Sequence, residues 1–514
     1  MSGSRGAIAD RWWIAALLAA VAVVLLVNPV GFIGGGLDDY QYLNAARCWR
    51  DFGPCLPYDH WQARWPVIAP IAGFTAVAGE SRATVGTMPL VESLACLFLL
   101  AAIGNRMFGR PVGWIAALLM VVTPIFAIQL LDPSVESVEL GFILAGFLAL
   151  LVWENRRNSY LALLSALFFA LAIQVRETAA TAALFAFIYI IARRSRPRPA
   201  DWVCAVAGFS LPFVLEFVTF WVSTGDPFWR RRLDIHHTLI PSSELMVVPD
   251  PNRSPLFNKD YIANWKPSAG IHVNWLIDGL LNLFANGESG LSLFFVPLLG
   301  LLSSDASVRR FRRSAIALWL IALTYSCVLI YVFAVDPKPR MMFVPFALTN
   351  MGFALLSFRL LQRKAAIVRT TWIVSTAVML PIVYGFPSDL MLEPAAKKWM
   401  ADYPGQIEID GNTRRHLALV PAAAQLPGLD SDREYVMYRS VASCKTWIEH
   451  NGLPPHTLSV ISEAPTSHLE WLVPRLHIPL CLLHYDRQIS GDEFRAAFRR
   501  SRTDGNFMVG MRGL

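Results

Sequence analysis

The stretch Gly34-Gly-Gly-Leu-Asp-Asp-Tyr-Gln-Tyr-Leu-Asn-Ala-Ala46 decides how the rest of the chain is interpreted. It places two adjacent carboxylates, Asp38 and Asp39, directly after the first apolar segment, where a membrane helix would meet water. Apolar residues then recur at helical spacing, which predicts an amphipathic helix lying along the membrane surface. Asp38 also suits a helix N-cap, with Gln41 three residues later as in a capping box. A structural and a functional role for the acidic pair are compatible.

The composition indicates a polytopic membrane protein. Hydrophobic residues make up 55% of the 514 positions and charged residues only 16%, against roughly 25% charged residues in soluble domains. The mean hydropathy is +0.43. The net charge of +7 does not indicate nucleic acid, because the basic residues fall in short clusters between apolar runs, as they do in cytoplasmic loops. We therefore expect membrane lipids, and not nucleic acid, around this chain.

Apolar runs predict about eleven membrane spans. The first, Trp12–Val30, has no convincing cleavage site, so we expect a signal anchor with a cytoplasmic N-terminus. The run Pro66–Gly79, about fourteen residues long, is short for a span and is expected to lie at the interface. The other predicted spans are Thr84–Gly104, Pro111–Leu131, Val135–Trp153, Tyr160–Gln174, Thr178–Ala192, Trp202–Val222, Ser289–Ser303, Ser314–Ala334, Met341–Leu361 and Ile367–Phe386.

Basic clusters orient these spans, because they all fall on one side when Pro66–Gly79 does not cross. That side is expected to be cytoplasmic, and its turns carry Arg106, Arg110, Arg156, Arg157, Arg193, Arg194, Arg196, Arg198, Arg309, Arg310, Arg312, Arg313, Arg363, Lys364 and Arg369. The opposite turns carry Asp38, Asp39, Asp132, Arg176, Glu177, Asp336, Lys338 and Arg340. Several of these lie beside apolar segments, and ionisable groups at that depth usually pair or face a cavity. We expect the functional site on this second side.

Two domains are expected. Residues 1–386 form a transmembrane domain with external loops at 31–83 and 223–288, and residues 387–514 form a small α/β domain outside the membrane. The predicted strands of the tail are Thr457–Ile461, Leu480–His484 and Asn506–Met511, and its predicted helices are Ser467–Leu476 and Gly491–Ser501. An oxidising face permits disulfides between Cys48 and Cys55 and between Cys444 and Cys481, but spacing does not establish the pairing.

Short motifs follow the acidic pair in a definite order. After Asp38-Asp39-Tyr40-Gln41-Tyr42 come Ala63-Arg64-Trp65-Pro66, Gly79-Glu80-Ser81-Arg82, the turn Gly104–Arg110 with Thr123-Pro124, Leu131-Asp132-Pro133, Val175-Arg176-Glu177-Thr178 and Lys338-Pro339-Arg340. This order resembles the GT-C superfamily of polyprenyl-phosphate-sugar-dependent glycosyltransferases, in the branch of aminoarabinose transferases and protein O-mannosyltransferases. Those proteins usually carry Asp-Glu at the acidic pair, and here the second position is Asp39.

The resemblance implies an α-helical polytopic enzyme of GT-C type in the inner membrane. It would transfer a sugar from a polyprenyl-phosphate donor to a hydroxyl of a lipid, glycan or protein at the periplasmic face, by a single inverting displacement. A carboxylate can accept the proton of the hydroxyl, so Asp38 is the candidate base, with Asp39 or Asp132 as its orienting partner. Cations stabilise the charge that develops on a leaving phosphate, which makes Arg64 and Arg340 its candidate ligands.

Arg176 and Glu177 are candidate substrate-binding residues, although a simple ion pair between the two explains them equally well. The other candidates also have structural alternatives. Arg64 suits an interfacial anchor, Arg340 a snorkelling side chain at a helix end, and Asp132 a helix-turn signal. The pair His236-His237 leaves a divalent metal cofactor open, but adjacent histidines in a polar loop are more often solvated.

Two other functions compete with a sugar transferase. A non-enzymatic flippase or transporter of lipid-linked sugars would place its charged residues near the bilayer midplane and not at one face. An oligosaccharide polymerase would be an enzyme that joins longer glycans. The sequence names neither the sugar nor the acceptor, because a fold resemblance does not determine the substrate.

Overall fold

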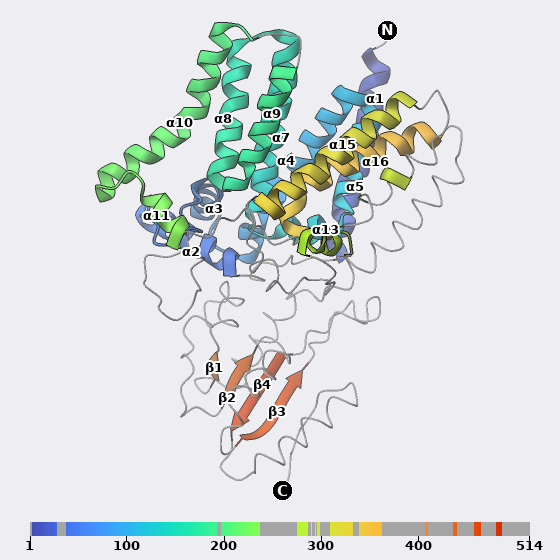
Figure 1. Cartoon of the computed structure of the whole chain (residues 1–514). Coiled ribbons are helices and arrows are strands. Elements are labelled where there is room, and N and C mark those ends of the chain that lie inside the picture. The colour runs from blue at the N-terminus through green and yellow to red at the C-terminus, as the bar shows by residue number, and fades with distance from the viewer. Residues whose placement is uncertain are drawn as a thin grey trace.

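The computed structural model describes residues 3–27, 37–192, 197–236, 275–285, 309–332 and 339–361, isolated positions between 289 and 298, and four strands after residue 406. Nearly all of the described residues before 362 are helical (Figure 1). Five of the described helical segments are long and apolar enough to cross a membrane: Ala83–Phe108, Val135–Arg156, Pro199–Thr224, Phe311–Val332 and Pro339–Phe358. They belong to α4 (Arg82–Phe108), α7 (Val135–Arg156), α10 (Pro199–Thr224), α15 (Arg309–Cys327) and α16 (Phe343–Leu361).

A sixth predicted span is broken. α5 (Arg110–Val121) is followed by a segment over Pro124–Leu131, made of α6 (Pro124–Ile128) and a 3-10 turn, and the two parts meet at 71°. Pro124 lacks a backbone N–H and cannot continue the preceding helix, which explains the break. α1 (Gly3–Val27), α8 (Ser159–Val175) and α9 (Ala180–Ala192) match three more predicted spans. Most of Ser289–Ser303 and all of Ile367–Phe386 lie outside the described residues, so eleven spans stay a prediction.

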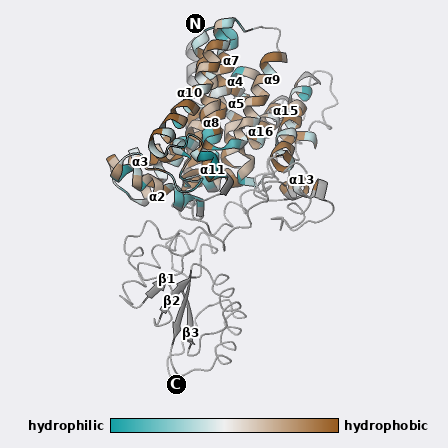
Figure 2. Cartoon of the chain, turned by 60° about the vertical axis from the view of Figure 1, so that its left-hand side comes forward, coloured by the Kyte–Doolittle hydropathy of each residue, from teal (hydrophilic) through white to brown (hydrophobic). Residues whose placement is uncertain are grey.

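Glycines let the helices approach closely. A Cβ at Gly113 of α5 would collide with the backbone of α4 at Ala101. A Cβ at Gly104 of α4 would likewise collide with the Cα atom of Gly113. Small residues at helix crossings allow such contact in membranes. One large apolar core joins α4, α5, α7, α15 and α16. Figure 2 shows the hydrophobic colouring along these helices, with hydrophilic colouring gathered near α11.

The predicted surface helix is present as α2 (Leu37–Phe52), and its predicted apolar face is buried against α3 (Trp65–Ala78). Tyr42 is completely buried, and Leu43 and Ala46 are nearly so. α2 begins at Leu37, so Asp38 lies in its first turn and is not the N-cap. A negative charge there interacts favourably with the helix dipole. α3 has 14 residues, a length that fits the predicted interfacial helix.

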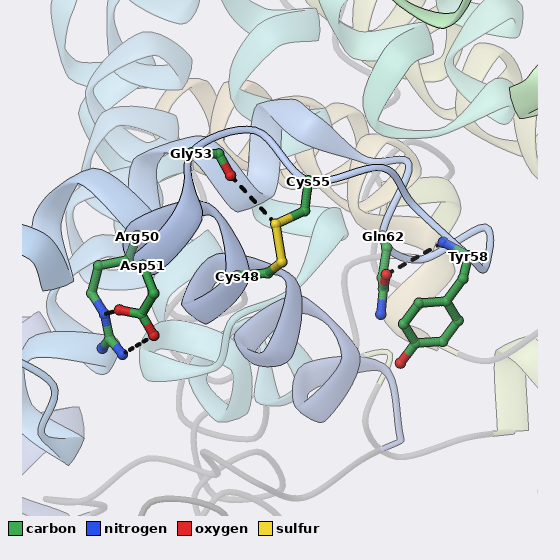
Figure 3. Close-up of a disulfide and its surroundings, with 7 residues drawn as sticks. All are labelled: Cys48, Arg50, Asp51, Gly53, Cys55, Tyr58 and Gln62. Atoms are coloured by element: carbon green, nitrogen blue, oxygen red, sulfur yellow. Dashed lines mark hydrogen bonds and ion pairs between the residues drawn. A yellow bond between two sulfur atoms is a disulfide. The ribbon is translucent and has the colours of Figure 1, made fainter. Parts of the chain in front are cut away.

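A disulfide joins Cys48 in the last turns of α2 to Cys55 in the following loop, with a Cα–Cα distance of 6.0 Å. Figure 3 shows the bond beside the exposed ion pair of Arg50 and Asp51 and the loop residues Tyr58 and Gln62. Of the two pairings considered, this one is present. The other cannot be examined, because Cys444 lies outside the described residues.

Four strands form one sheet in the order β1-β2-β4-β3. They are β1 (Ile407–Ile409), β2 (Tyr435–Tyr438), β3 (Thr457–Glu463) and β4 (Leu480–Tyr485). β1 pairs with β2 in parallel, and the other pairs are antiparallel. β3 and β4 coincide with two predicted strands. The predicted strand Asn506–Met511 and both predicted helices of the tail lie outside the described residues, so the α/β domain stays a prediction.

Candidate functional site

The acidic pair opens a cluster of charged residues at one end of the helices. Asp38, in the first turn of α2, forms an ion pair with Arg340, whose Nη2 lies 3.4 Å from Oδ2 of Asp38. Arg340 belongs to the 3-10 turn Pro339–Met342 that leads into α16. The two side chains are 28% and 33% exposed, so both remain accessible to a ligand. The fold therefore joins residues that are 302 positions apart in sequence.

Asp39 and Asp132 form the second pair of the cluster. Their side chains are hydrogen-bonded to each other, and Asp39 is only 7% exposed. Burial raises the pKa of Asp132 well above its ordinary value, and the neighbouring carboxylates of Asp39 and Glu136 raise it further. Two carboxyl groups that are hydrogen-bonded to each other cannot both ionise readily, so this arrangement favours one shared proton. Asp38 is thus partnered by Arg340, whereas Asp39 and Asp132 partner each other.

Arg64 and Tyr42 connect α2 with the start of α3. Arg64 precedes the first residue of α3, and its Nη1 donates a hydrogen bond to the hydroxyl of Tyr42 at 2.5 Å. Burial raises the pKa of Tyr42 above its ordinary value despite the opposing charge of Arg64. Tyr42 thus stays a neutral phenol, and among the described residues Arg64 forms no ion pair. The guanidinium of Arg64 keeps donors for an anionic ligand.

Arg176 and Glu177 do not pair with each other, contrary to one prediction. Arg176 ends α8 in an extended conformation, which directs successive side chains to opposite sides. Its Nη1 lies 3.5 Å from Oε1 of Glu136 in the first turn of α7, and its guanidinium also contacts the sulfur of Met341. Glu177 turns instead toward α11 (Trp229–His236), where Arg230 binds it at 2.9 Å.

Three charged residues of this cluster were missed by the sequence reasoning. Glu136 and Glu139 lie in the first turns of α7 and are 5% and 7% exposed. Thr178 donates a hydrogen bond to Oε1 of Glu139 at 3.2 Å. Two carboxylates at the start of an apolar span were the available signal. Arg230 was the third, and its signal was a run of three arginines in a loop expected to be external.

The cluster does not form an evident metal site. Among the described residues, no group of three or more His, Cys, Asp or Glu side chains could hold a metal ion. The hydrogen bond between Asp39 and Asp132 engages two of the carboxyl groups, and the cation beside Asp38 is Arg340. The side chain of His236 and the whole of His237 lie outside the described residues. The described residues as arranged therefore bring no such set of metal ligands together.

All seven predicted site residues lie in the described part of the chain and at the same end of the helices. They come from α2, the start of α3, the α6–α7 turn, the α8–α9 turn and the turn before α16. Asp336 and Lys338 lie outside the described residues. The cluster combines an accessible carboxylate at Asp38 with guanidinium groups on two sides, which suits taking a proton from one group while binding an anion.

A family model matches part of this chain. Residues 66–219 match the model described as dolichyl-phosphate-mannose-protein mannosyltransferase. Over this segment the resemblance to protein O-mannosyltransferases is confirmed. It begins at α3 and ends within α10, and it includes Asp132, Arg176 and Glu177 but neither α2 nor Arg340. The match supports a membrane glycosyltransferase. No curated protein matches the chain by sequence.

Solved structures of similar proteins include two kinds of enzyme. An oligosaccharyltransferase from Archaeoglobus fulgidus, in complex with Zn and sulfate, is 14% identical with a TM-score of 0.47 over 90% of this chain and 75% of that one. The oligosaccharyltransferase AglB from the same organism, with an inhibitory peptide and a dolichol-phosphate, is 14% identical with a TM-score of 0.42 over 86% and 58%. ArnT from Cupriavidus metallidurans in the apo state is 12% identical with a TM-score of 0.42 over 92% and 98%.

Proposed function

We propose that this GT-C-like protein transfers a sugar from a polyprenyl-phosphate donor to a hydroxyl group of a lipid, glycan or protein acceptor. The observation that carries the proposal is the approach of Arg340 to Asp38 at 3.4 Å, with Arg64 beside the same helix. Helix α2 thus carries a proton acceptor, Asp38, that contacts one guanidinium, and a phenol, Tyr42, that binds the other. The description of the matched family also names a phosphate-linked lipid sugar as the donor.

The proposed chemistry is a single displacement. The acceptor oxygen forms a bond to the anomeric carbon of the sugar, and its proton passes to the carboxylate of Asp38. The bond between that carbon and the phosphate oxygen breaks, and polyprenyl phosphate leaves with an added negative charge. Arg64 and Arg340 stabilise this charge by charge-assisted hydrogen bonds. Attack opposite the leaving group inverts the configuration of the sugar.

Asp39 and Asp132 serve a different purpose in this proposal. The proton that they share leaves one negative charge on the pair instead of two, and so reduces repulsion of the incoming phosphate. They also hold α2 against the turn before α7. Arg176 pairs with Glu136 at the start of α7, next to the same turn, and it also contacts Met341, the residue after Arg340.

The position of the charges favours an enzyme over a transporter. A transporter would carry its ionisable residues on broken helices near the midplane. Here the proposed site residues gather where the helices end, beside a surface helix. The disulfide between Cys48 and Cys55 lies on the same helix as Asp38 and supports an oxidising, periplasmic side for this face.

Substitution of Asp38 by asparagine tests the proposal. Lipids of membranes with and without the protein, compared by mass spectrometry, first identify the sugar and the acceptor. Turnover is then measured with purified protein, the polyprenyl-phosphate sugar and a hydroxyl acceptor. We expect Asp38→Asn to lower turnover by roughly 10²–10⁴ because the base is lost. Folding should be retained, because a partly exposed ion pair contributes at most about 1 kcal/mol.

Asp51→Asn provides the matched control. Asp51 lies in the same helix, is an exposed carboxylate paired with Arg50, and is far from the proposed chemistry by sequence and by its contacts. The Asp51→Asn variant should have the same turnover as the native protein. Near-native turnover of Asp38→Asn with a hydroxyl acceptor would rule out Asp38 as the base.

A further inference from the structure

The helix α11 carries three consecutive arginines, Arg230 to Arg232, at the end of the molecule that holds the candidate site (Figure 1). Such runs are expected on the cytoplasmic side, so their presence here calls for another explanation. Arg231 is exposed, and Arg232 forms an ion pair with Asp226 at 2.7 Å. Arg230 differs from both, because its side chain is only 12% exposed.

Arg230 ties three elements together. Its Nη2 donates to the backbone oxygen of Gln174 at the end of α8 at 2.9 Å, and its Nη1 lies 3.1 Å from Oε2 of Glu216 in α10. It also pairs with Glu177 at 2.9 Å and faces Asp234 one turn along α11 at 3.6 Å. Three carboxylates thus surround one guanidinium. Without Arg230, these carboxylates would lack the cation that they share.

Glu177 lies beside Arg64 in the fold, because it follows Val175 by two residues, and Val175 is buried in one cluster with Tyr42, the hydrogen-bond partner of Arg64. Both Arg230 and Arg64 act to lower the pKa of Glu177, against the effect of burial. Burial in turn acts to lower the pKa of Arg64, whereas the carboxylates of Glu177 and Asp38 and the hydrogen bond to Tyr42 act to raise it. Arg64 forms its hydrogen bond with Tyr42 and no ion pair with Glu177 among the described residues. Arg230 therefore holds the carboxylate that would otherwise compete for Arg64.

We propose that Arg230 is a positioning residue that engages Glu177 and thereby keeps Arg64 free for the phosphate of the donor. This inference rests on the proposed function, in which Arg64 binds that phosphate. An anion and a carboxylate compete for the same guanidinium donors, so neutralising the carboxylate strengthens anion binding. Glu177 is 50% exposed, which limits the strength of its ion pairs.

A double-mutant cycle tests the inference with the full-length purified protein. The probe is polyprenyl phosphate, and the uncharged polyprenol serves as the reference ligand. Arg230→Gln should weaken binding of polyprenyl phosphate by about three- to fivefold, as expected for a partly exposed ion pair. The double variant with Glu177→Gln should bind again within about twofold of the native protein, because the competing charge is gone.

Glu216→Gln is the matched control. Glu216 binds the same guanidinium at 3.1 Å from α10, and its charge is not among the largest effects on Arg64. It should leave the affinity for polyprenyl phosphate unchanged. Arg230→Lys keeps a charge opposite Glu177 and should bind the phosphate more tightly than Arg230→Gln does. Polyprenol should bind equally to all variants if their folds are intact.

The outcomes separate this inference from the proposed function. Equal weakening in Arg230→Gln and in the double variant would overturn the inference and assign Arg230 a direct or purely structural role. Native affinity of Arg230→Gln would also overturn it. If Arg64→Ala binds polyprenyl phosphate as the native protein does, then Arg64 is no phosphate ligand and the proposed function loses that part. If Arg230→Gln also loses binding of polyprenol, Arg230→Lys and Glu177→Gln are compared instead. The inference is contradicted if Arg230→Lys loses binding of polyprenyl phosphate but keeps binding of polyprenol.

Discussion

Arg340 pairs with Asp38 and Arg64 binds Tyr42 of the same helix, and each arginine can be removed without breaking a buried ion pair. We expect Arg64→Ala and Arg340→Ala to weaken donor use by about 1.5–3 kcal/mol, the contribution of a hydrogen bond to a charged group. Lysine at either position should restore part of the loss, because the charge returns without the planar fork. The measurement is KM and kcat for the polyprenyl-phosphate sugar. Native values in both alanine variants would make these residues interfacial anchors.

Asp132 gives the site a pH dependence with a definite sign. Its folded pKa is raised by burial and by Asp39, so the native state keeps a proton that the unfolded chain has released. The free energy of unfolding therefore falls as pH rises above the ordinary value of 3.8 toward the raised folded value. Asp132→Asn cannot lose that proton, and its amide can still donate to Asp39. Its melting temperature should depend less on pH than that of the native protein as pH rises above 3.8.

Asp51→Asn serves as the control for this measurement. Its hydrogen bond with Arg50 lowers the pKa of Asp51, so its titration is complete below this pH range. The slope of melting temperature against pH should be that of the native protein. Parallel slopes for native protein and Asp132→Asn would mean that the pair with Asp39 holds no shared proton.

At the scale of elements, the crossing of α4 and α5 sets the position of the turn that carries Asp132. Gly113→Ala would place a Cβ against the backbone of Ala101 and the side chain of Asn105, neither of which can move freely. We expect a loss of about 1–3 kcal/mol, typical of an overpacked contact. Gly73→Ala in α3 meets nothing within 4 Å and should be nearly neutral. Thermal unfolding in detergent compares the two, and equal melting temperatures would contradict the close packing of α4 and α5.

The sequence predicts helices and their buried faces well where apolar residues recur with a single period. The apolar positions of α2 are buried as expected, and the short run that became α3 lies beside it. The span Pro111–Leu131 was predicted as one segment, although Thr123-Pro124 was expected to close a helix there, and the break lies at these residues. The N-cap prediction for Asp38 was wrong by two residues, because α2 already begins at Leu37 and helix ends depend on local geometry more than on periodicity.

At the scale of the whole molecule, the pairing of charges could not be predicted, because it joins elements distant in sequence. Nothing in the residues around Arg176 indicates that it pairs with Glu136, or that Glu177 turns to Arg230. Those choices depend on how α7, α8 and α11 meet. Predicting that all the candidates lie on one side of the membrane needed only the distribution of arginines and no knowledge of their contacts.

The orientation of the chain in the membrane is the last prediction. α10 has 26 residues and extends for about 39 Å at 1.5 Å per residue, more than the hydrocarbon core of about 30 Å. Its Arg198 end and its α11 end must therefore lie on opposite sides. Reporter fusions after Arg198 and after Arg313 should report the cytoplasm, because basic clusters are retained there. Fusions between Asp226 and Lys266 and after Pro387 should report the outside. A cytoplasmic signal from either external position would place Asp38 and its arginines on the wrong face for an oxidised Cys48–Cys55 bond, and the proposed periplasmic reaction would have to be abandoned.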